Sequence, residues 1–225
     1  MTAAGITTVI FDMDGVLIDS EPVHQHHERQ LFRELGIEVS EEEHRSYVGT
    51  SARDCWAQLI EKHGIDRTVD DLLEMGRCRY LDQLLSGHGV SLCEGSADLI
   101  ELFMDEGYSL LLASSATRQT IHTVLEHFGL KEYFSVIVSA DDIARSKPAP
   151  DPFLKAATLA GVSAGSCLVI EDSTNGVLAA RAAGMYCIGY QNPSGFHQDL
   201  SAADRVVHAL REIDLDMVRE IQEQR

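Results

Sequence analysis

Residues 6–22 read ITTVIFDMDGVLIDSEP, and this stretch decides the fold. The run Ile6 to Phe11 is β-branched and apolar, with no polar residue after Thr8. That composition is typical of a strand buried on both faces of a parallel sheet. The run ends directly at an acidic loop that carries Asp12 and Asp14. The stretch therefore predicts a central parallel strand with two carboxylates at its carboxyl end.

Similar apolar runs recur farther along the chain and alternate with helical patterns. The runs lie at residues 109–113, 136–138, 167–170 and 186–189, and a short edge strand is expected at 205–207. The clearest helical pattern begins after Thr117, an N-cap residue, and stops at Gly129. This alternation predicts an α/β fold, a doubly wound, Rossmann-like parallel sheet with helices on both faces. Such sheets bind ligands at the carboxyl ends of their strands.

The segment from about residue 20 to residue 88 breaks the alternation. It contains four helical patterns and no convincing strand, and the patterns lie at residues 22–35, 41–48, 52–63 and 69–85. Ser40, Ser51 and Thr68 stand before the last three as N-caps, each with an acidic residue three positions later. We therefore expect an all-helical cap at 18–87, inserted into an α/β core made of 1–17 and 88–225.

Composition excludes several classes of partner. The chain has 18 Lys and Arg against 36 Asp and Glu, a net charge of −18, whereas nucleic-acid binding needs clustered cations. No apolar run approaches the roughly 20 residues of a membrane span, and the N-terminus lacks the basic region of a signal peptide. We expect a cytoplasmic protein, a monomer or weak dimer, with no nucleic-acid or membrane partner.

Cysteine spacing gives no metal or disulfide framework. The five cysteines are an odd number without a close pair, and they stand at positions 55, 78, 93, 167 and 187. Neither a set of disulfides nor a zinc site fits this spacing. We expect them to be small buried side chains in a reducing compartment.

Polar residues follow three later strands of the expected sheet. Ser114 and Ser115 follow the run at 109–113, Lys147 lies beyond the run at 136–138, and Glu171 with Asp172 follows the run at 167–170. The carboxyl ends of parallel strands share one edge of the sheet, so these side chains should meet there. Taken alone, the pair of aspartates in the first loop equally fits a solvated acidic turn. The polar residues of the other strands favour a site.

This set of side chains suits phosphoryl transfer, in which positioning and charge neutralisation do most of the work. Asp12 is the candidate nucleophile that forms an aspartyl phosphate, and Asp14 is the candidate general acid and base. Gathered carboxylates repel phosphate, so we expect Mg²⁺, which prefers oxygen ligands. The expected ligands of Mg²⁺ are Asp12, Asp14 through its backbone carbonyl, Glu171 and Asp172. The expected phosphate-binding residues are Ser114, Ser115 and Lys147.

These motifs resemble those of the haloacid dehalogenase superfamily, in the helical-cap branch that includes β-phosphoglucomutases and many small-metabolite phosphatases. The matching segments are DMDG at 12–15, Ser114 after an apolar strand, Lys147 within SKPAPDPF, and EDSTNGVLAARAAGM at 171–185. The resemblance covers almost the whole chain and implies that Asp12 is the nucleophile and Asp14 the acid/base. Dehalogenases of this superfamily have no Asp at the second position, so Asp14 favours phosphate chemistry.

The resemblance extends into the expected cap. In the mutase that the chain resembles, a histidine at the position of His24 contacts the acid/base and couples cap closure to its alignment. The turn at Thr50 opens a helix whose N–H groups could face an anion. The mutase carries a distal-phosphate arginine where this chain has Ala52, and Arg53, the next residue, is rotated by about 100°. Near the metal site, Asn175 is expected to orient the ligands.

We therefore expect a Mg²⁺-dependent phosphatase of a small phosphorylated metabolite, in particular a sugar phosphate. A phosphohexomutase of the β-phosphoglucomutase type is the alternative, because it uses the same two aspartates, but the departure at Ala52 argues against it. A receiver-type phospho-acceptor switch also combines acidic residues, Mg²⁺, a hydroxyl and a lysine on a doubly wound sheet. The helical insertion argues against a receiver, since a receiver needs no lid.

Overall fold

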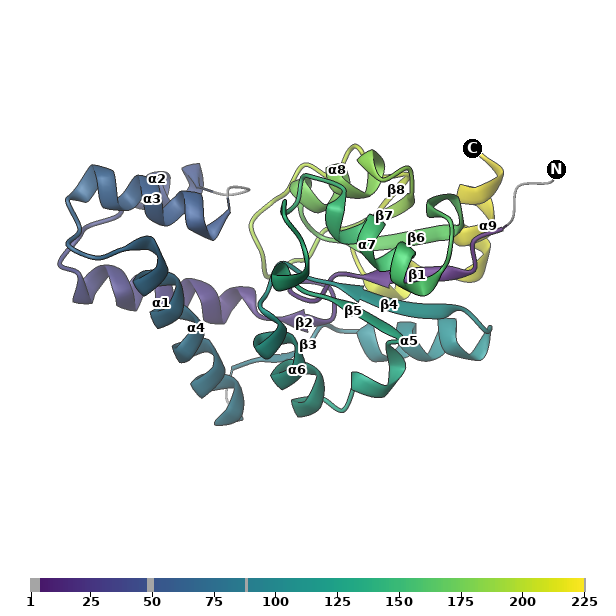
Figure 1. Cartoon of the computed structure of the whole chain (residues 1–225), viewed down its shortest axis with the longest axis horizontal. Helices are drawn as coiled ribbons and strands as arrows, with labels where there is room; N and C mark the ends of the chain where they lie inside the picture. The colour runs from purple at the N-terminus through teal and green to yellow at the C-terminus, as the bar shows by residue number, and fades with distance from the viewer. Residues whose placement is uncertain (1–4, 48–50, 88, 225) are drawn as a thin grey trace. The chain divides into compact units, whose positions relative to one another are not determined.

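The computed structural model of the chain describes residues 5–47, 51–87 and 89–224. The chain divides into two compact units, one formed by Met1–Asp19 with Ser91–Arg225 and the other by Ser20–Val90. These divisions lie close to the expected boundaries at 17/18 and 87/88. Figure 1 labels the helices and strands of both units.

The first unit is built on a parallel sheet. Its strands are β1 (Thr8–Phe11), β4 (Ser109–Ala113), β5 (Val136–Val138), β6 (Cys167–Glu171), β7 (Tyr186–Tyr190) and β8 (Arg205–Val207). They lie in the order β5-β4-β1-β6-β7-β8, and every pairing among them is parallel. Phe11 at the end of β1 pairs with Leu112 on one side and Ile170 on the other. The carboxyl ends of β1, β4 and β6 therefore stand side by side.

Helices cover both faces of this sheet. They are α5 (Ser96–Asp105), α6 (Arg118–His127), α7 (Asp151–Ala160), α8 (Thr174–Ala182) and α9 (Leu215–Glu223), with short 3₁₀ turns at η1 (Lys131–Tyr133), η2 (Ala140–Asp142), η3 (Ala164–Ser166) and η4 (Leu210–Glu212). Ile10 shares a buried cluster with Phe153 of α7 and Val177 of α8.

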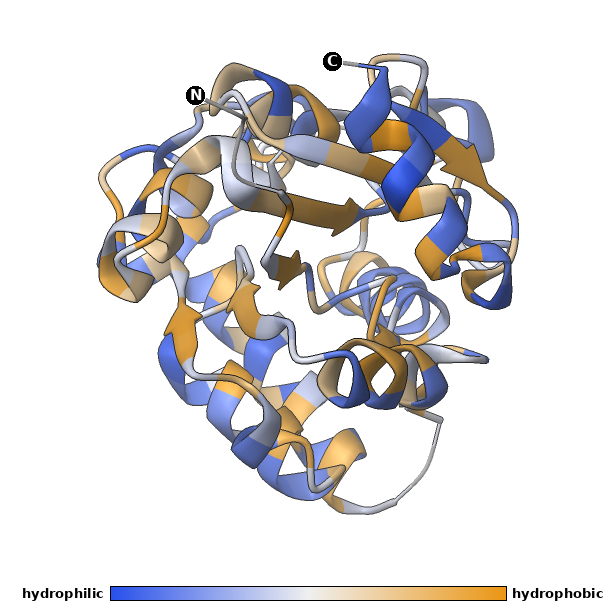
Figure 2. Cartoon of the chain, turned by 90° about the vertical axis from the view of Figure 1, so that its right-hand side faces the viewer, coloured by the Kyte–Doolittle hydropathy of each residue, from blue (hydrophilic) through white to orange (hydrophobic). Residues whose placement is uncertain are grey.

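The next residue of β1 faces the opposite side, because successive strand side chains alternate. There the ring of Phe11 packs edge-on against Phe103 of α5, with centroids 6.3 Å apart. Figure 2 shows the strands largely apolar and the helices carrying both apolar and polar residues. Burial of the sheet on both faces confirms the expected doubly wound α/β fold.

A two-stranded antiparallel sheet not expected from the sequence lies where the chain leaves and re-enters the first unit. Strands β2 (Ile18–Asp19) and β3 (Ser91–Leu92) pair antiparallel. The backbone N–H of Cys93 donates to the carbonyl of Leu17 at 2.9 Å and extends the pairing. Two-residue strands carry no readable alternation of polar and apolar residues, which is why the sequence did not predict them.

The second unit contains the helices of the expected cap. They are α1 (Glu21–Glu34), α2 (Glu41–Ser46), α3 (Ala52–His63) and α4 (Val69–Leu85). Leu31 and Phe32 of α1 form its core with Trp56 and Leu59 of α3 and Leu72 of α4. In the described ranges, no helix combines the length and the apolar character needed to cross a membrane.

The cysteines are all free thiols. Cys93, Cys167 and Cys187 are buried, as expected, and Cys55 is half-buried. Cys78 is exposed, so the expectation that all five are buried was wrong. Its thiol donates to Glu74, four residues earlier in α4, at 3.4 Å.

Candidate active site

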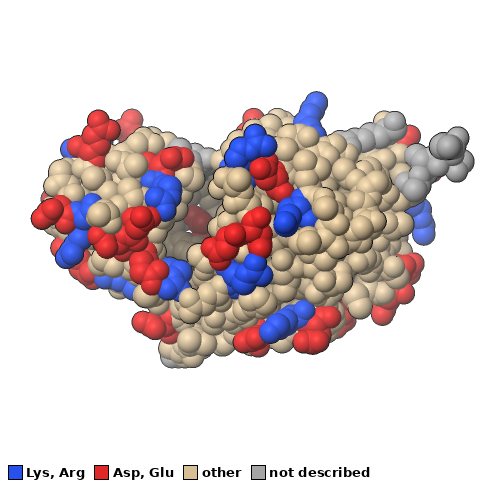
Figure 3. Space-filling view, viewed as in Figure 1, with Lys and Arg blue, Asp and Glu red and all other residues tan. Residues whose placement is uncertain are grey.

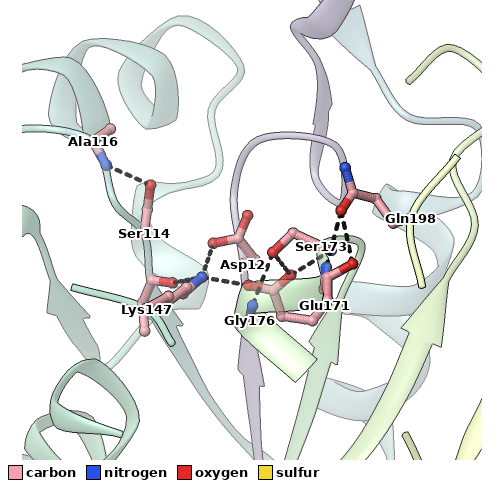
Figure 4. Close-up of polar contacts among 10 residues, drawn as sticks. Asp12, Ser114, Ala116, Lys147, Glu171, Ser173, Gly176 and Gln198 are labelled. Atoms are coloured by element: carbon pink, nitrogen blue, oxygen red, sulfur yellow. Dashed lines mark hydrogen bonds and ion pairs between the residues drawn. The ribbon is translucent and has the colours of Figure 1, made fainter. Parts of the chain in front are cut away.

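The carboxyl ends of three neighbouring strands bring the polar residues of the core together (Figure 4). Asp12 directly follows β1, Glu171 is the last residue of β6, and Ser114 directly follows β4. All three are buried. Lys147 reaches the same place from the segment between η2 and α7. The register of the sheet therefore assembles residues that are up to 159 positions apart in the sequence (171 − 12 = 159).

Lys147 connects the two buried carboxylates. Its Nζ donates to Asp12 Oδ1 at 2.5 Å, to Glu171 Oε1 at 2.5 Å and to the carbonyl of Ala113 at 3.3 Å. The side chains of Lys147, Asp12 and Glu171 are 7%, 9% and 1% exposed. Because buried charges are costly unless they are paired, these three groups depend on one another.

The electrostatics of this cluster shift several pKa values. Burial raises the pKa of Asp12 to about 7, because Glu171 and Asp14 add to the desolvation while the pull of Lys147 only partly opposes it. Burial likewise raises the pKa of Asp172 well above its ordinary range, with the charges of Glu171 and Asp12 adding to the effect. Burial opposes the charged form of Lys147, but Asp12 and Glu171 outweigh it and raise the pKa of that ammonium group. The lysine stays a cation, whereas the raised pKa values of Asp12 and Asp172 favour uptake of a proton by these carboxyls.

The carboxylates form a set that fits a hard cation. Asp12, Glu171 and Asp172 each offer one oxygen, and these oxygens lie within 4.8 Å of one another. An all-oxygen donor set of this size suits Mg²⁺. Burial is the main cause of the raised pKa values of Asp12 and Asp172, and repulsion between the neighbouring carboxylates adds to it, so a bound cation would stabilise their charged forms.

Gly15 allows the first loop to lie directly against Asp172. Its φ is +81°, and a Cβ at this position would stand 1.9 Å from Asp172 Oδ2. Only glycine combines that backbone conformation with such a close approach. Asp14, half-buried, precedes it and forms a bridge to Ile18 in the same tight turn. The DMDG motif therefore brings its own backbone to the acidic cluster.

Glu171 is also fixed at the start of α8. Its Oε2 accepts from the backbone N–H of Ser173 at 2.8 Å and from the Ser173 hydroxyl at 2.9 Å. The Ser173 hydroxyl in turn accepts from the N–H of Gly176 at 3.0 Å and caps the helix. A Cβ at Gly176 would lie 1.7 Å from Glu171 Oε1, so this position also requires glycine. Asn175 lies half-buried in the same helical turn.

The two serines after β4 differ in exposure. Ser114 is 2% exposed, and its hydroxyl accepts from the N–H of Ala116 at 3.1 Å. Its own N–H donates to the carbonyl of Val138 at 3.1 Å. Ser115 is exposed. The hydroxyl proton of Ser114 is therefore left to donate to an oxygen, since the accepted bond uses only a lone pair.

The residues expected in the cap have partners within their own unit. The ring of His24 stacks on Tyr80 with centroids 4.7 Å apart. Arg53 pairs with Asp70 at 2.5 Å on the surface. Thr50 lies outside the described residues. The structure thus brings together the core residues that the sequence singled out, and it gives His24 and Arg53 contacts inside the helical unit.

Two residues of the loop after β7 were missed by the sequence interpretation, which treated residues 191–204 as a polar loop beside the sheet. Asn192 is buried and donates through Nδ2 to the carbonyl of Gly15 at 2.9 Å. Gln198 Oε1 accepts from the N–H and the hydroxyl of Thr174 at 3.2 and 3.0 Å. A signal was present, because an amide followed by Pro directly after a strand marks a loop at the carboxyl edge of the sheet.

On the face of the molecule shown in Figure 3, charged side chains of both signs are present. Figure 3 shows acidic and basic side chains interspersed over the face in view. Arg145, for example, holds Asp151 through two bonds at 3.1 and 2.9 Å, and Lys131 pairs with Glu126 at 2.7 Å. Lys147 is likewise paired, with the buried carboxylates of Asp12 and Glu171.

Known proteins resemble this chain in sequence and in fold. The family model described as haloacid dehalogenase-like hydrolase matches residues 9–190. Protein CbbY of Rhodobacter capsulatus is 32% identical over 208 residues, 88% of this chain and 91% of the relative. Hexitol phosphatase B of Escherichia coli (strain K12) is 31% identical over 191 residues, 83% of this chain and 84% of the relative. The crystal structure of CbbY from Rhodobacter sphaeroides in complex with phosphate has a TM-score of 0.82 at 25% identity, covering 95% of this chain and 99% of that one.

A longer relative matches through one part of its length. The chloroplastic protein Suppressor of Quenching 1 of Arabidopsis thaliana is 36% identical over 187 residues, which make up 81% of this chain. The chain spans only 18% of that relative. The similarity therefore concerns one segment of the plant protein.

Proposed function

The chain belongs to the haloacid dehalogenase-like hydrolases, in the branch of small-metabolite phosphatases, and from that premise we propose that it is a Mg²⁺-dependent phosphatase of a sugar phosphate. One observation carries the proposal. Lys147 bridges Asp12 and Glu171 at 2.5 Å each, and Asp172 completes an oxygen cluster beside them. A nucleophile, a fixed cation and a cation-binding set thus meet at one edge of the sheet.

In the proposed reaction a carboxylate oxygen of Asp12 attacks phosphorus, and the bond from phosphorus to the sugar oxygen breaks. Asp14 gives a proton to the leaving sugar oxygen. Asp14 then removes a proton from water, which attacks the phosphorus of the aspartyl phosphate and releases inorganic phosphate. The two steps return Asp12 and Asp14 to their starting states.

The other residues of the site would neutralise and hold the charged phosphoryl group. Lys147 would hold an oxygen of the phosphoryl group and keep Asp12 ionised, and the free proton of Ser114 would donate to another oxygen. Ser115, the next residue in the chain, would also bind the phosphoryl group. Mg²⁺, held by Asp12, Asp172, the backbone carbonyl of Asp14 and Glu171, would neutralise the phosphoryl oxygens. Asn175 would orient this metal loop from the start of α8.

The choice of a phosphatase over a mutase rests on the helical unit. A mutase must hold the second phosphate of a bisphosphorylated sugar, and its arginine position is Ala52 here. Five cations of the described part of this unit are paired with carboxylates instead. The pairs are Arg29–Glu41, Arg53–Asp70, Lys62–Glu43, Arg77–Glu74 and Arg79–Glu34. Each would have to give up its partner to bind a phosphate.

Sugar phosphates are proposed as the substrates because a relative of matched length carries the name hexitol phosphatase B. A receiver-type switch does not fit this chain, because the family to which the chain belongs is one of hydrolases.

The test is to incubate the protein with Mg²⁺ and a panel of phosphosugars, including β-glucose 1-phosphate with glucose 1,6-bisphosphate, and to follow phosphate and isomer together. Release of phosphate is expected. Isomerised sugar without phosphate release would instead establish a mutase. Asp12→Asn should abolish turnover, and Asp14→Asn should leave a slow or trapped phosphoenzyme. Asp105→Asn, at the exposed end of α5, is the matched control and should keep full activity.

A further inference from the structure

The loop between β7 and β8 contains a buried amide that serves the catalytic loop. Asn192 is 5% exposed. Its Nδ2 donates to the carbonyl of Gly15 at 2.9 Å, and its Oδ1 accepts from the N–H of Ser194 at 2.8 Å. Its own N–H donates to the carbonyl of Tyr190 at 3.0 Å. A buried amide with both ends bonded is held in one orientation, so it can fix what it touches.

Asn192 bonds the peptide of Gly15, which lies against Asp172. The N–H of Gly15 donates to the carbonyl of Ile18 at 2.8 Å, while the carbonyl of Gly15 accepts from Asn192. The Cα of Gly15 lies so close to Asp172 that an added Cβ would stand 1.9 Å from a carboxylate oxygen. A rotation of this peptide would therefore move either the first loop or the carboxylate.

The same loop holds the other side of the acidic cluster. Gln198 Oε1 accepts from the N–H and hydroxyl of Thr174, at 3.2 and 3.0 Å, and the N–H of Asp199 donates to that hydroxyl at 3.0 Å. Thr174 is the first residue of α8 and stands two positions after Asp172. Figure 4 shows Gln198 beside the segment of Glu171 and Ser173.

We propose that residues 191–199, the clamp loop, set the spacing between the DMDG loop and Asp172, with Asn192 and Gln198 as positioning residues for the cation site. This inference rests on the proposed cation site but not on the identity of the substrate. Neither residue touches the reacting atoms. Their effect is on how well the carboxylates are arranged before the cation arrives, which lowers the cost of binding.

Binding of Mg²⁺ alone to the full chain, measured by isothermal titration calorimetry without substrate, tests the clamp loop. Asn192→Ala should weaken Mg²⁺ affinity by about 10-fold or more, the usual cost of removing a partner that orients metal ligands. Asn192→Leu, which has similar size and no donor, should do the same. Gln58→Ala, an amide truncation at an exposed position of α3 outside residues 191–199, is the matched control, and its affinity should equal that of the wild type.

Two variants of Gln198 test the same proposal if the Asn192 variants do not fold. Gln198→Ala removes the acceptor from Thr174 and should weaken Mg²⁺ binding, whereas Gln198→Glu keeps an acceptor oxygen and should bind at least as well as the wild type. In activity assays, the Mg²⁺ concentration for half-maximal rate should rise while KM for the phosphosugar at saturating Mg²⁺ stays unchanged. A merely structural role would not separate these two constants.

The outcomes distinguish the two proposals. If the wild type binds Mg²⁺ and folded Asn192 or Gln198 alanine variants bind it equally well, the clamp loop is overturned and the proposed phosphatase stands. If the wild type binds no Mg²⁺, the cation site itself is wrong and both proposals fail. Weakened binding in the alanine variants with normal binding in Gln58→Ala supports the clamp loop whatever the substrate.

Discussion

Replacing Lys147 by methionine removes the cation that touches both Asp12 and Glu171 and keeps most of the side-chain volume. The two bonds are 2.5 Å long, and the three side chains are less than a tenth exposed. A hydrogen bond to a charged group contributes about 1.5–3 kcal/mol, and breaking a buried pair costs about 3–5 kcal/mol because a charge is left unpaired. We expect the variant to lose about 3–5 kcal/mol of unfolding free energy at about pH 8.

The loss should shrink as the pH falls. Burial raises the pKa of Asp12 from 3.8 to about 7, and a carboxyl with a raised folded pKa destabilises the fold progressively as the pH rises through that window. In the variant, protonation of Asp12 can remove the unpaired charge, and it costs about 1.4 kcal/mol for each pH unit above the ordinary pKa of the carboxyl. Protonating Asp12 then costs about 6 kcal/mol at about pH 8 but only about 2 kcal/mol at about pH 5. The variant should therefore regain part of its stability at the lower pH.

The assay is urea-induced unfolding without Mg²⁺ at both pH values, together with phosphate release at saturating Mg²⁺. Lys155→Met, which removes an exposed lysine of the neighbouring helix α7, is the control and should match the wild type in both. Turnover by Lys147→Met should fall by about a hundred- to a thousand-fold, the usual cost of losing one group that stabilises the transition state. Unfolding and turnover equal to those of the control would refute the reasoning.

Two further predictions concern the cation site. Gly15→Ala should abolish Mg²⁺ binding, because its Cβ would stand 1.9 Å from Asp172 Oδ2; Gly107→Ala, also at positive φ (+79°) but with nothing within 4 Å, carries only the backbone strain and should bind normally. Equal binding by the two variants in calorimetry would contradict this account. Because metal-free Asp12 has a pKa of about 7 and that of Asp172 is raised, Mg²⁺ must displace protons, so its affinity should fall as the pH drops below about 7, by up to about tenfold per unit for each proton. A Mg²⁺ affinity that stays the same across this pH range would contradict the prediction.

The sequence predicted correctly those helices and strands whose own residues form a recognisable local pattern. The apolar run ending at Phe11 gave the central strand, and its carboxyl end then located Asp12. Ser51 and Thr68 marked two helix starts correctly, because an N-cap is a local signal. Helices and buried strands are local patterns, so the doubly wound sheet followed from them.

Contacts between distant loops could not be predicted in the same way. The bond from Asn192 to Gly15 joins residues 177 positions apart and depends on the order of the strands in the sheet. The bonds of Ser173 to Glu171 depend on the turn geometry at the start of α8. Their residue types are common in loops, so composition alone does not separate a positioning amide from a solvated one.

The central claim is that Asp12 takes the phosphoryl group. The most direct measurement is mass spectrometry of the Asp14→Asn variant after incubation with Mg²⁺ and a phosphosugar and a rapid acid quench. The account predicts one added phosphoryl group on the peptide that contains Asp12, and none when Asp12 is also replaced by Asn. Turnover with no phosphorylated peptide, or a phosphoryl group on any other residue, would contradict it.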